Sequence, residues 1–194
     1  DYVTLSIGGN DVNFSDIIQD CVMKSTYLGS NSLEKRIKKL WDEFDTTRSN
    51  IKEVYCDIQN AAGAQAEIIV AGYPKLLDKN GKGKAISKKE ATIVNDNVSK
   101  FNDKLEEIIN ECSENGMNIH FVDVETEFDK DGGHQAYSEN AWINDVMIIP
   151  KDQDLTFMPP SAYSIHPNAS GAEAYARCVN EKIQEIESNK KVGT

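Results

Sequence analysis

Residues 1–11 read DYVTLSIGGND, and this stretch decides the fold class. It consists of a short apolar run at residues 3–7, rich in β-branched side chains, and a glycine turn directly after it. Residues 67–71 and 118–122 form two further runs of the same kind, each followed by turn or loop residues. Such runs are typical of strands that are buried on both faces of a parallel sheet. We therefore expect three parallel strands.

A long amphipathic segment between the second and third strands predicts a crossover helix. Ser87 and Glu90 have the spacing of a capping box, in which two side chains satisfy the first free amides of a helix. Gly116 marks the expected end of this helix. Apolar residues between these signals recur at three- and four-residue spacing, as on one helix face; they are Val94, Val98, Phe101, Leu105, Ile108, Ile109 and Cys112.

Other apolar stripes predict further helices before and after this one. One stripe comprises Leu33, Ile37, Leu40, Trp41 and Phe44, and another comprises Ile51, Val54, Tyr55 and Ile58. The last helix is expected to open at a second capping box, Ser170 to Glu173, and to bury a stripe from Ala174 to Ile186. Alternating strands and helices indicate an α/β fold with a parallel sheet.

The length and charge of the chain limit its function. Its 194 residues suit a single domain, residues 1–194. The 32 acidic and 21 basic side chains give a formal net charge of −11, which argues against nucleic acid or an anionic membrane as a partner, because both would repel the chain. No apolar run approaches the roughly 18 residues of a membrane-spanning helix. Since the chain opens inside a strand, we expect it to be the C-terminal portion of a longer chain.

The four cysteines show neither a metal nor a redox pattern. No pair has CxxC spacing, and no cluster of His, Cys, Asp or Glu has the spacing of metal ligands, so no metal site is predicted. Cys112 and Cys178 lie on apolar stripes and are expected to be small buried side chains. The alternative, which would suit an exported protein, is a disulfide between Cys21 and Cys56.

The first group of candidate functional residues, Gly8-Gly9-Asn10-Asp11, directly follows the first strand. Ligands of parallel α/β folds bind outside the carboxyl ends of the strands. Glycines there allow a substrate to approach the main chain, and the Asn10 amide is a neutral donor that suits a developing oxyanion. Asp11 would fix the turn by accepting main-chain amides. The alternative is a plain Gly-Asn turn between strand and helix.

The second group lies just before the last helix and contains His166 and Pro167. Pro167 restricts the residue before it and so keeps His166 extended. An imidazole on such a loop suits a general base near neutral pH, and the alternative is an exposed loop histidine. The other histidines are weaker candidates. His120 is expected in the core or at a sheet edge, and His134 either at the rim of the site or on a surface loop.

Together these segments resemble the SGNH hydrolase family, also called GDSL-type lipases and esterases. Residues 5–11, LSIGGND, resemble its third block, Gly-x-Asn-Asp, and residues 164–171, SIHPNASG, resemble its fifth block with the histidine. Residues 70–74, VAGYP, are similar to a strand end of secreted bacterial members. Residues 133–134, GH, and 142–144, WIN, are similar to a loop of the same branch.

The resemblance implies a three-layer α/β/α fold and hydrolysis of lipid, aryl or carbohydrate acyl esters by a serine nucleophile, without a cofactor. It implies that Asn10 is an oxyanion-hole donor, and that His166 takes the proton of the serine and returns it to the leaving alcohol. An extracellular location is expected, because this branch is mostly exported. The residues that would support the site are Gly8, Gly9, Asp11 and Tyr163.

One departure from the family pattern concerns the orientation of His166. The family usually has Asp three residues before the histidine, where this chain has Tyr163. An Asp selects the imidazole tautomer and stabilises the imidazolium. In its place we expect a main-chain carbonyl near Tyr163 to accept the Nδ1–H, which orients the ring but stabilises its charge less.

A larger departure is the absence of the nucleophile block. No serine stands in Gly-Asp-Ser or in Gly-x-Ser-x-Gly, and the missing strand–helix–strand unit would have on the order of 30 residues or more. In the family, the strand at residues 3–7 pairs with the nucleophile strand. We therefore expect its free edge to be covered by an identical chain or by a separate N-terminal piece. The chain alone is expected to be inactive.

Two other functions are compatible with these observations. A non-catalytic binding or assembly module on the same fold would account for the missing serine and for Tyr163, but it has no physical need for both Asn10 and His166. An acyl transferase on the same scaffold would use the same residues and differ only in its acyl acceptor.

Overall fold

The computed structural model describes residues 1–9, 17, 31–80, 86–146 and 164–192. In chain order, its elements are β1 (Tyr2–Leu5), α2 (Asn31–Asp42), α3 (Phe44–Ala62), β2 (Glu67–Ala71), α4 (Lys88–Glu114), β3 (Ile119–Val122), α5 (Glu125–Asp129), the 3₁₀ helix η1 (Lys130–Gly132) and α6 (Ala169–Val192).

The described strands form one parallel sheet in the order β1-β2-β3. Val3 is paired with Ile68, and Ile69 with His120. All five residues of β2 are buried, as expected for a central strand covered on both faces. The prediction for β2 is confirmed to the residue. β1 begins one residue before the predicted range of 3–7 and ends two residues earlier, and β3 begins one residue after the predicted start at 118.

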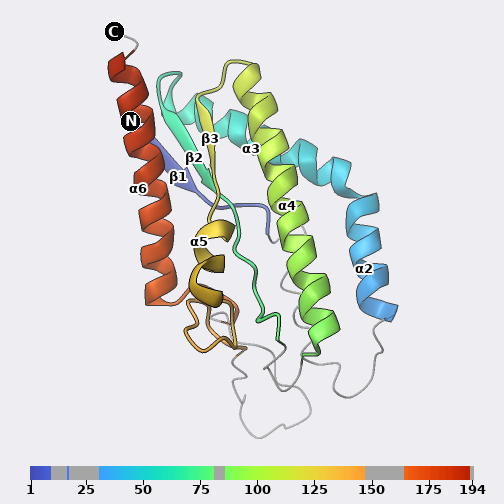
Figure 1. Ribbon diagram of the computed structural model, residues 1–194. Helices are drawn as coiled ribbons and strands as arrows, with labels where there is room; N and C mark the ends of the chain where they lie inside the picture. The colour runs from blue at the N-terminus through green and yellow to red at the C-terminus, as the bar shows by residue number, and fades with distance from the viewer. Residues whose placement is uncertain (10–16, 18–30, 81–85, 147–163, 193–194) are drawn as a thin grey trace, which may run out of the picture.

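Helices cover both faces of the sheet, which gives three layers (Figure 1). Ile68 and Val70 of β2 point into a large buried cluster that includes side chains of α3 and α4. Ile69 and Ala71, whose side chains alternate to the other face, pack with Ile186 of α6. The expected three-layer α/β/α arrangement is therefore confirmed.

The predicted start of α4 is confirmed in detail. Ser87 Oγ accepts a hydrogen bond from the Glu90 amide at 3.3 Å, and the Glu90 carboxylate accepts one from the Ser87 amide at 2.9 Å. The helix ends before Gly116, whose φ of +91° is a conformation that favours glycine. The local capping signals were sufficient here because every group involved lies within one helical turn.

The helices before β2 differ from the prediction at two residues. The first helix ends at Asp42 and a new one begins at Phe44, so Phe44 is the first residue of α3 and not the last residue of the first apolar stripe. It remains buried, at 6% exposure. Val54 is 41% exposed, because α3 turns Ile51 and Tyr55 inward and the residue next to Tyr55 points about 100° away from it.

The predicted capping box of the last helix is wrong. α6 begins at Ala169, so Ser170 lies inside its first turn and is exposed. The cap is Asn168, whose Oδ1 accepts a hydrogen bond from the Gly171 amide at 3.1 Å. Asn168 is the cap in place of Ser170 because hydrogen bonds to residues 141–144 hold the segment before the helix and thereby fix where the helix begins.

Cys112 is buried, as expected, whereas Cys178 is only half-buried. Cys56 is an exposed free thiol, and Cys21 lies outside the described residues. In the described part of the chain, no helix combines the length and the apolar composition that crossing a bilayer requires.

Candidate active site

The loop that carries His166 lies at the carboxyl edge of the sheet. Near the start of α6, the Tyr175 hydroxyl donates to the main-chain oxygen of Gly72, just after β2, at 3.0 Å. Near its end, the Lys190 ammonium lies 2.7 Å from the carboxylate of Glu67, the first residue of β2. α6 therefore runs opposite to the strands (Figure 1), and its preceding loop lies at the edge where Gly8 and Gly9 follow β1.

The His166 ring is oriented by the main chain. Its Nδ1 lies 2.9 Å from the carbonyl oxygen of Ser164. Because a carbonyl only accepts hydrogen bonds, the neutral ring carries its proton on Nδ1, which leaves the lone pair on Nε2. The His166 side chain is exposed, so this lone pair is accessible. The acceptor is next to Tyr163, where a main-chain carbonyl was expected; Tyr163 itself lies outside the described residues.

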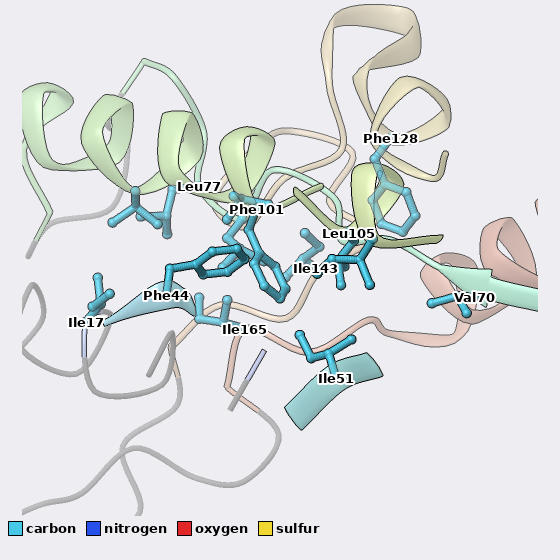
Figure 2. Close-up of a cluster of buried hydrophobic side chains, with 14 of the residues drawn as sticks. Ile17, Phe44, Ile51, Val70, Leu77, Phe101, Leu105, Phe128, Ile143 and Ile165 are labelled. Carbon is cyan, nitrogen blue, oxygen red and sulfur yellow. The ribbon is translucent and has the colours of Figure 1, made fainter. Parts of the chain in front are cut away.

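An unusual backbone conformation makes this contact possible. Ile165 has a φ of +56°, which for a β-branched residue is a strained, left-handed conformation. The turn at Ile165 brings His166 back over the residue two positions earlier. The Ile165 side chain is 8% exposed and belongs to the buried cluster that contains Phe44, Ile51 and Phe101 (Figure 2).

The two glycines after β1 are closely packed against the same cluster. Gly8 has a φ of +99°, and a Cβ atom built there would lie 2.8 Å from the Phe101 ring. A Cβ atom at Gly9 would lie 3.0 Å from the Tyr73 ring, and the Gly9 amide donates to the Tyr73 hydroxyl at 3.0 Å. Gly8 therefore requires glycine, whereas a side chain at Gly9 would have to displace the Tyr73 ring by a few tenths of an ångström. Asn10 and Asp11 lie outside the described residues.

Tyr73 is in turn fixed by an asparagine that the sequence analysis missed. Asn102 of α4 accepts a hydrogen bond from the Tyr73 amide at 2.8 Å and donates to the Tyr73 carbonyl at 2.7 Å. Its amide group also donates to the Glu125 carboxylate at 2.8 Å. Asn95, two turns earlier on α4, binds the main chain of Leu77 in the same way. The sequence signal that could have identified them is the spacing of Asn95 and Asn102, which lie seven residues apart and so share one helix face beside the apolar stripe.

This geometry agrees with the comparison to known sequences. The profile of the family described as GDSL-like lipase/acylhydrolase matches residues 1–179. The chain belongs to the GDSL-like lipase/acylhydrolase family. It is 27% identical over 176 residues to a lipase of Streptomyces rimosus, covering 88% of this chain and 56% of the relative. It is 28% identical over 170 residues to Lipase 1 of Streptomyces coelicolor, covering 87% and 55%. The chain thus spans about half the length of these curated relatives.

Solved structures of other proteins show the same fold as this GDSL-like family member. The extracellular lipase of S. rimosus superposes with a TM-score of 0.72, and phospholipase A1 of Streptomyces albidoflavus NA297 with 0.73. In both cases the sequence identity is 24%, and the match covers 93% of this chain and 68% of the other. The resemblance to the SGNH fold inferred from the sequence motifs is therefore confirmed.

The other two histidines of this GDSL-like chain have structural contacts. His134 is only 2% exposed, so it does not lie on a surface loop. Its ring stacks on Trp142 with a centroid distance of 3.5 Å, and its Nδ1 lies 2.7 Å from the carbonyl of Asn140. His120 lies on β3, an edge strand of the described sheet, with its Nε2 2.7 Å from the Glu67 carboxylate.

One surface pocket lies apart from His166. It has a volume of about 240 Å³, and Lys75, Asp129 and Gln135 line it. The Lys75 ammonium and the Gln135 amide lie 2.5 and 2.6 Å from the Asp129 carboxylate, so these polar groups satisfy one another. Across the described ranges, no three His, Cys, Asp or Glu side chains gather as a metal site would require.

Proposed function

We propose that this chain forms the histidine- and oxyanion-binding part of a serine ester hydrolase. The observation that carries the proposal is the His166 ring, whose Nδ1 is engaged by the Ser164 carbonyl while Nε2 is accessible at the carboxyl edge of the sheet. A general base needs this tautomer, because the second nitrogen must accept the proton of the nucleophile. Membership of the GDSL-like family supports the same chemistry.

The proposed reaction uses two side chains of this chain, His166 and Asn10, together with a serine that lies outside it. His166 Nε2 takes the proton of the serine hydroxyl as the serine oxygen attacks the ester carbonyl. Asn10 donates a hydrogen bond to the carbonyl oxygen as it becomes negative. When the ester bond breaks, His166 returns the proton to the leaving alcohol, and water then hydrolyses the acyl-serine by the same route.

The substrates in this proposal are lipid, aryl or carbohydrate acyl esters. The names of the relatives, a lipase and Lipase 1, support an acyl ester as substrate. We also propose an extracellular location, which agrees with the extracellular lipase of S. rimosus that has this fold. No cofactor takes part in the proposed steps.

We further propose that residues 1–194 are a single domain and the C-terminal portion of the complete enzyme. No serine in the chain has the Gly-Asp-Ser setting of the family nucleophile. The strand that would bear it belongs beside β1, which pairs with β2 along one edge and with no described residue along the other. An N-terminal piece, or a second copy of the chain, would cover that edge.

Hydrolysis of p-nitrophenyl acetate tests the proposal. The 194-residue chain is expected to be inactive, and robust turnover that His166→Ala abolishes would contradict this. In a form that carries the serine block, His166→Ala and Asn10→Ala are each expected to remove most activity; Asn10→Ala should lower kcat roughly 10²–10³-fold. His120→Ala is the matched control, because that ring lies on β3 and contacts Glu67 at the amino end of β2. Full activity of His166→Ala would overturn the assignment.

A further inference from the structure

A short segment, residues 141–144, is bonded to both sides of His166 in the sequence; we call it the strap. The Asn144 amide donates to the His166 carbonyl at 2.9 Å, and the Ile165 amide donates to the Asn144 carbonyl at 3.2 Å. On the other side, the Asn168 amide donates to the Trp142 carbonyl at 2.9 Å. The Asn168 side chain adds a bond to the carbonyl of Ala141 at 2.8 Å. The strap therefore fixes the main chain immediately before and after the imidazole.

The strap is itself held from behind by His134. The Trp142 ring lies parallel to the His134 ring, with 3.5 Å between the centroids and 2° between the planes. The Trp142 amide donates to the His134 carbonyl at 2.8 Å, and the edge of Phe128 packs against the Trp142 ring with centroids 5.4 Å apart. His134 is anchored by its amide on Phe128 and by its Nδ1 on Asn140. His134, held by these two hydrogen bonds, therefore supports the strap through its packing on Trp142.

The strap is needed because the turn that it holds is strained. A non-glycine residue in the left-handed region costs on the order of 1–3 kcal/mol and persists only where the surroundings fix it. The φ of +56° at Ile165 meets that description. The fixing contacts are the bond from its amide to Asn144 and the burial of its side chain. In this turn Nδ1 of His166 lies 2.9 Å from the carbonyl two residues earlier.

We propose that Trp142, clamped by the ring of His134, is a positioning residue for His166. By holding the strap, it maintains the strained turn and thereby imposes the Nδ1–H tautomer on the imidazole. This is the task that Asp performs in relatives with a carboxylate three residues before the histidine, where this chain has Tyr163. The proposal rests on the proposed role of His166 as a general base and adds how its ring is oriented.

The test reads the tautomer directly, by ¹⁵N NMR of the His166 ring in the 194-residue chain near pH 8. The wild-type ring is expected to show the Nδ1–H form. Trp142→Ala should shift it toward the Nε2–H form that free histidine prefers, and Trp142→Phe, which keeps an aromatic ring on His134, should retain most of the Nδ1–H form. Tyr2→Ala is the matched control: Tyr2 lies at the start of β1, bonds to Glu187 and packs in the cluster on the other face of the sheet, so its loss should leave the tautomer unchanged.

A second variant and a measurement on the wild type keep the proposal testable if Trp142→Ala does not fold. His134→Leu removes the stacked ring while leaving Trp142 in place, and it should shift the tautomer in the same direction. In the wild type, the Asn144 and Ile165 amides should exchange slowly with solvent, since both donate within the strap. Rapid exchange of these amides, or an Nδ1–H tautomer that persists in folded Trp142→Ala and His134→Leu chains, would overturn the proposal.

These readouts separate the positioning role from the proposed reaction, because a tautomer is measured without substrate or nucleophile. In a form that carries the serine block, Trp142→Ala should lower kcat on the order of 10²-fold, as for a misplaced catalytic group, with KM little changed. If Trp142→Ala shifts the tautomer without lowering kcat, the positioning role is supported and the role of His166 as general base is contradicted. If His166→Ala abolishes activity but Trp142→Ala does not shift the tautomer, the general base is supported and the positioning role is contradicted.

Discussion

The Tyr73 hydroxyl accepts a hydrogen bond from the Gly9 main-chain amide at 3.0 Å, which ties the segment after β2 to the turn after β1. Asn102 holds both main-chain polar groups of Tyr73, and Tyr175 of α6 holds the carbonyl of Gly72. The Gly72–Tyr73 segment thus touches the turn that leads to Asn10 and the helix that follows His166. It joins the two halves of the proposed site.

We predict that Tyr73→Phe loosens the Gly9 turn. The substitution keeps the ring but leaves a partly buried amide without its acceptor, which costs about 1–3 kcal/mol. Faster hydrogen exchange at the Gly9 amide would show it. Tyr137→Phe is the control, because its hydroxyl accepts from the Val146 amide at 3.2 Å, so only Val146 should respond. Unchanged Gly9 exchange in Tyr73→Phe would contradict the prediction.

Gly171→Ala is expected to destabilise the protein, although alanine usually stabilises a helix relative to glycine. A Cβ atom at this position would lie 2.3 Å from the main-chain oxygen of Trp142 and 2.9 Å from Cβ of Pro167. Such overpacking typically costs about 1–3 kcal/mol. Thermal unfolding measures the loss, with Ser170→Ala, an exposed neighbour in the same turn, as the control that should change little. A higher Tm for Gly171→Ala would refute the clash.

The stability of the amino edge of the sheet should depend on pH through Glu67. Burial of Glu67 opposes its ionisation, but hydrogen bonds from Lys190 and His120 outweigh burial and lower the pKa of its carboxyl below the ordinary value of 4.5. The unfolded chain therefore binds a proton at a higher pH than the folded chain does. The resulting stabilisation is complete above pH 4.5 and is lost as the pH falls toward the folded pKa.

Denaturant unfolding between pH 3 and 6 tests this pH dependence. Part of the loss of stability below pH 4.5 should disappear in Glu67→Gln. Glu185→Gln is a useful comparison, since Glu185 also has a lowered pKa, from Lys182, but at an exposed site where screening by solvent leaves little effect on stability. Equal pH profiles for wild type and Glu67→Gln would remove Glu67 as the cause.

The outer edge of β1 is predicted to be covered. Val3 and Leu5 are only half-buried, whereas the central strand β2 is wholly buried. Light scattering of the 194-residue chain should show a dimer, or the chain should bind an added N-terminal piece carrying the nucleophile strand. In either case the outward amides of β1 should become protected from exchange. A monomer that binds no such piece and exchanges these amides rapidly would disprove the prediction.

The sequence predicted elements where neighbouring residues decide the outcome, and it was wrong where distant residues do. The Ser87–Glu90 box was identified correctly because its groups face each other within one turn. The Ser170–Glu173 box has the same spacing but does not form, because the strap fixes Asn168 and makes it the cap. His134 was expected either at the rim of the site or on a surface loop; its burial excludes a surface position, and nothing near it in sequence reveals that it stacks on Trp142.

By itself, the sequence determined the parallel α/β fold and the family, because apolar periodicity and short motifs are properties of adjacent residues. The tertiary structure alone decided which distant residues hold the turn before His166 and what supports Gly9. The physical reason is that a buried polar group must find a partner, and packing, not sequence proximity, chooses it. The Gly9 amide finds Tyr73, the Tyr73 main chain finds Asn102, and the strained turn at Ile165 is held by Asn144.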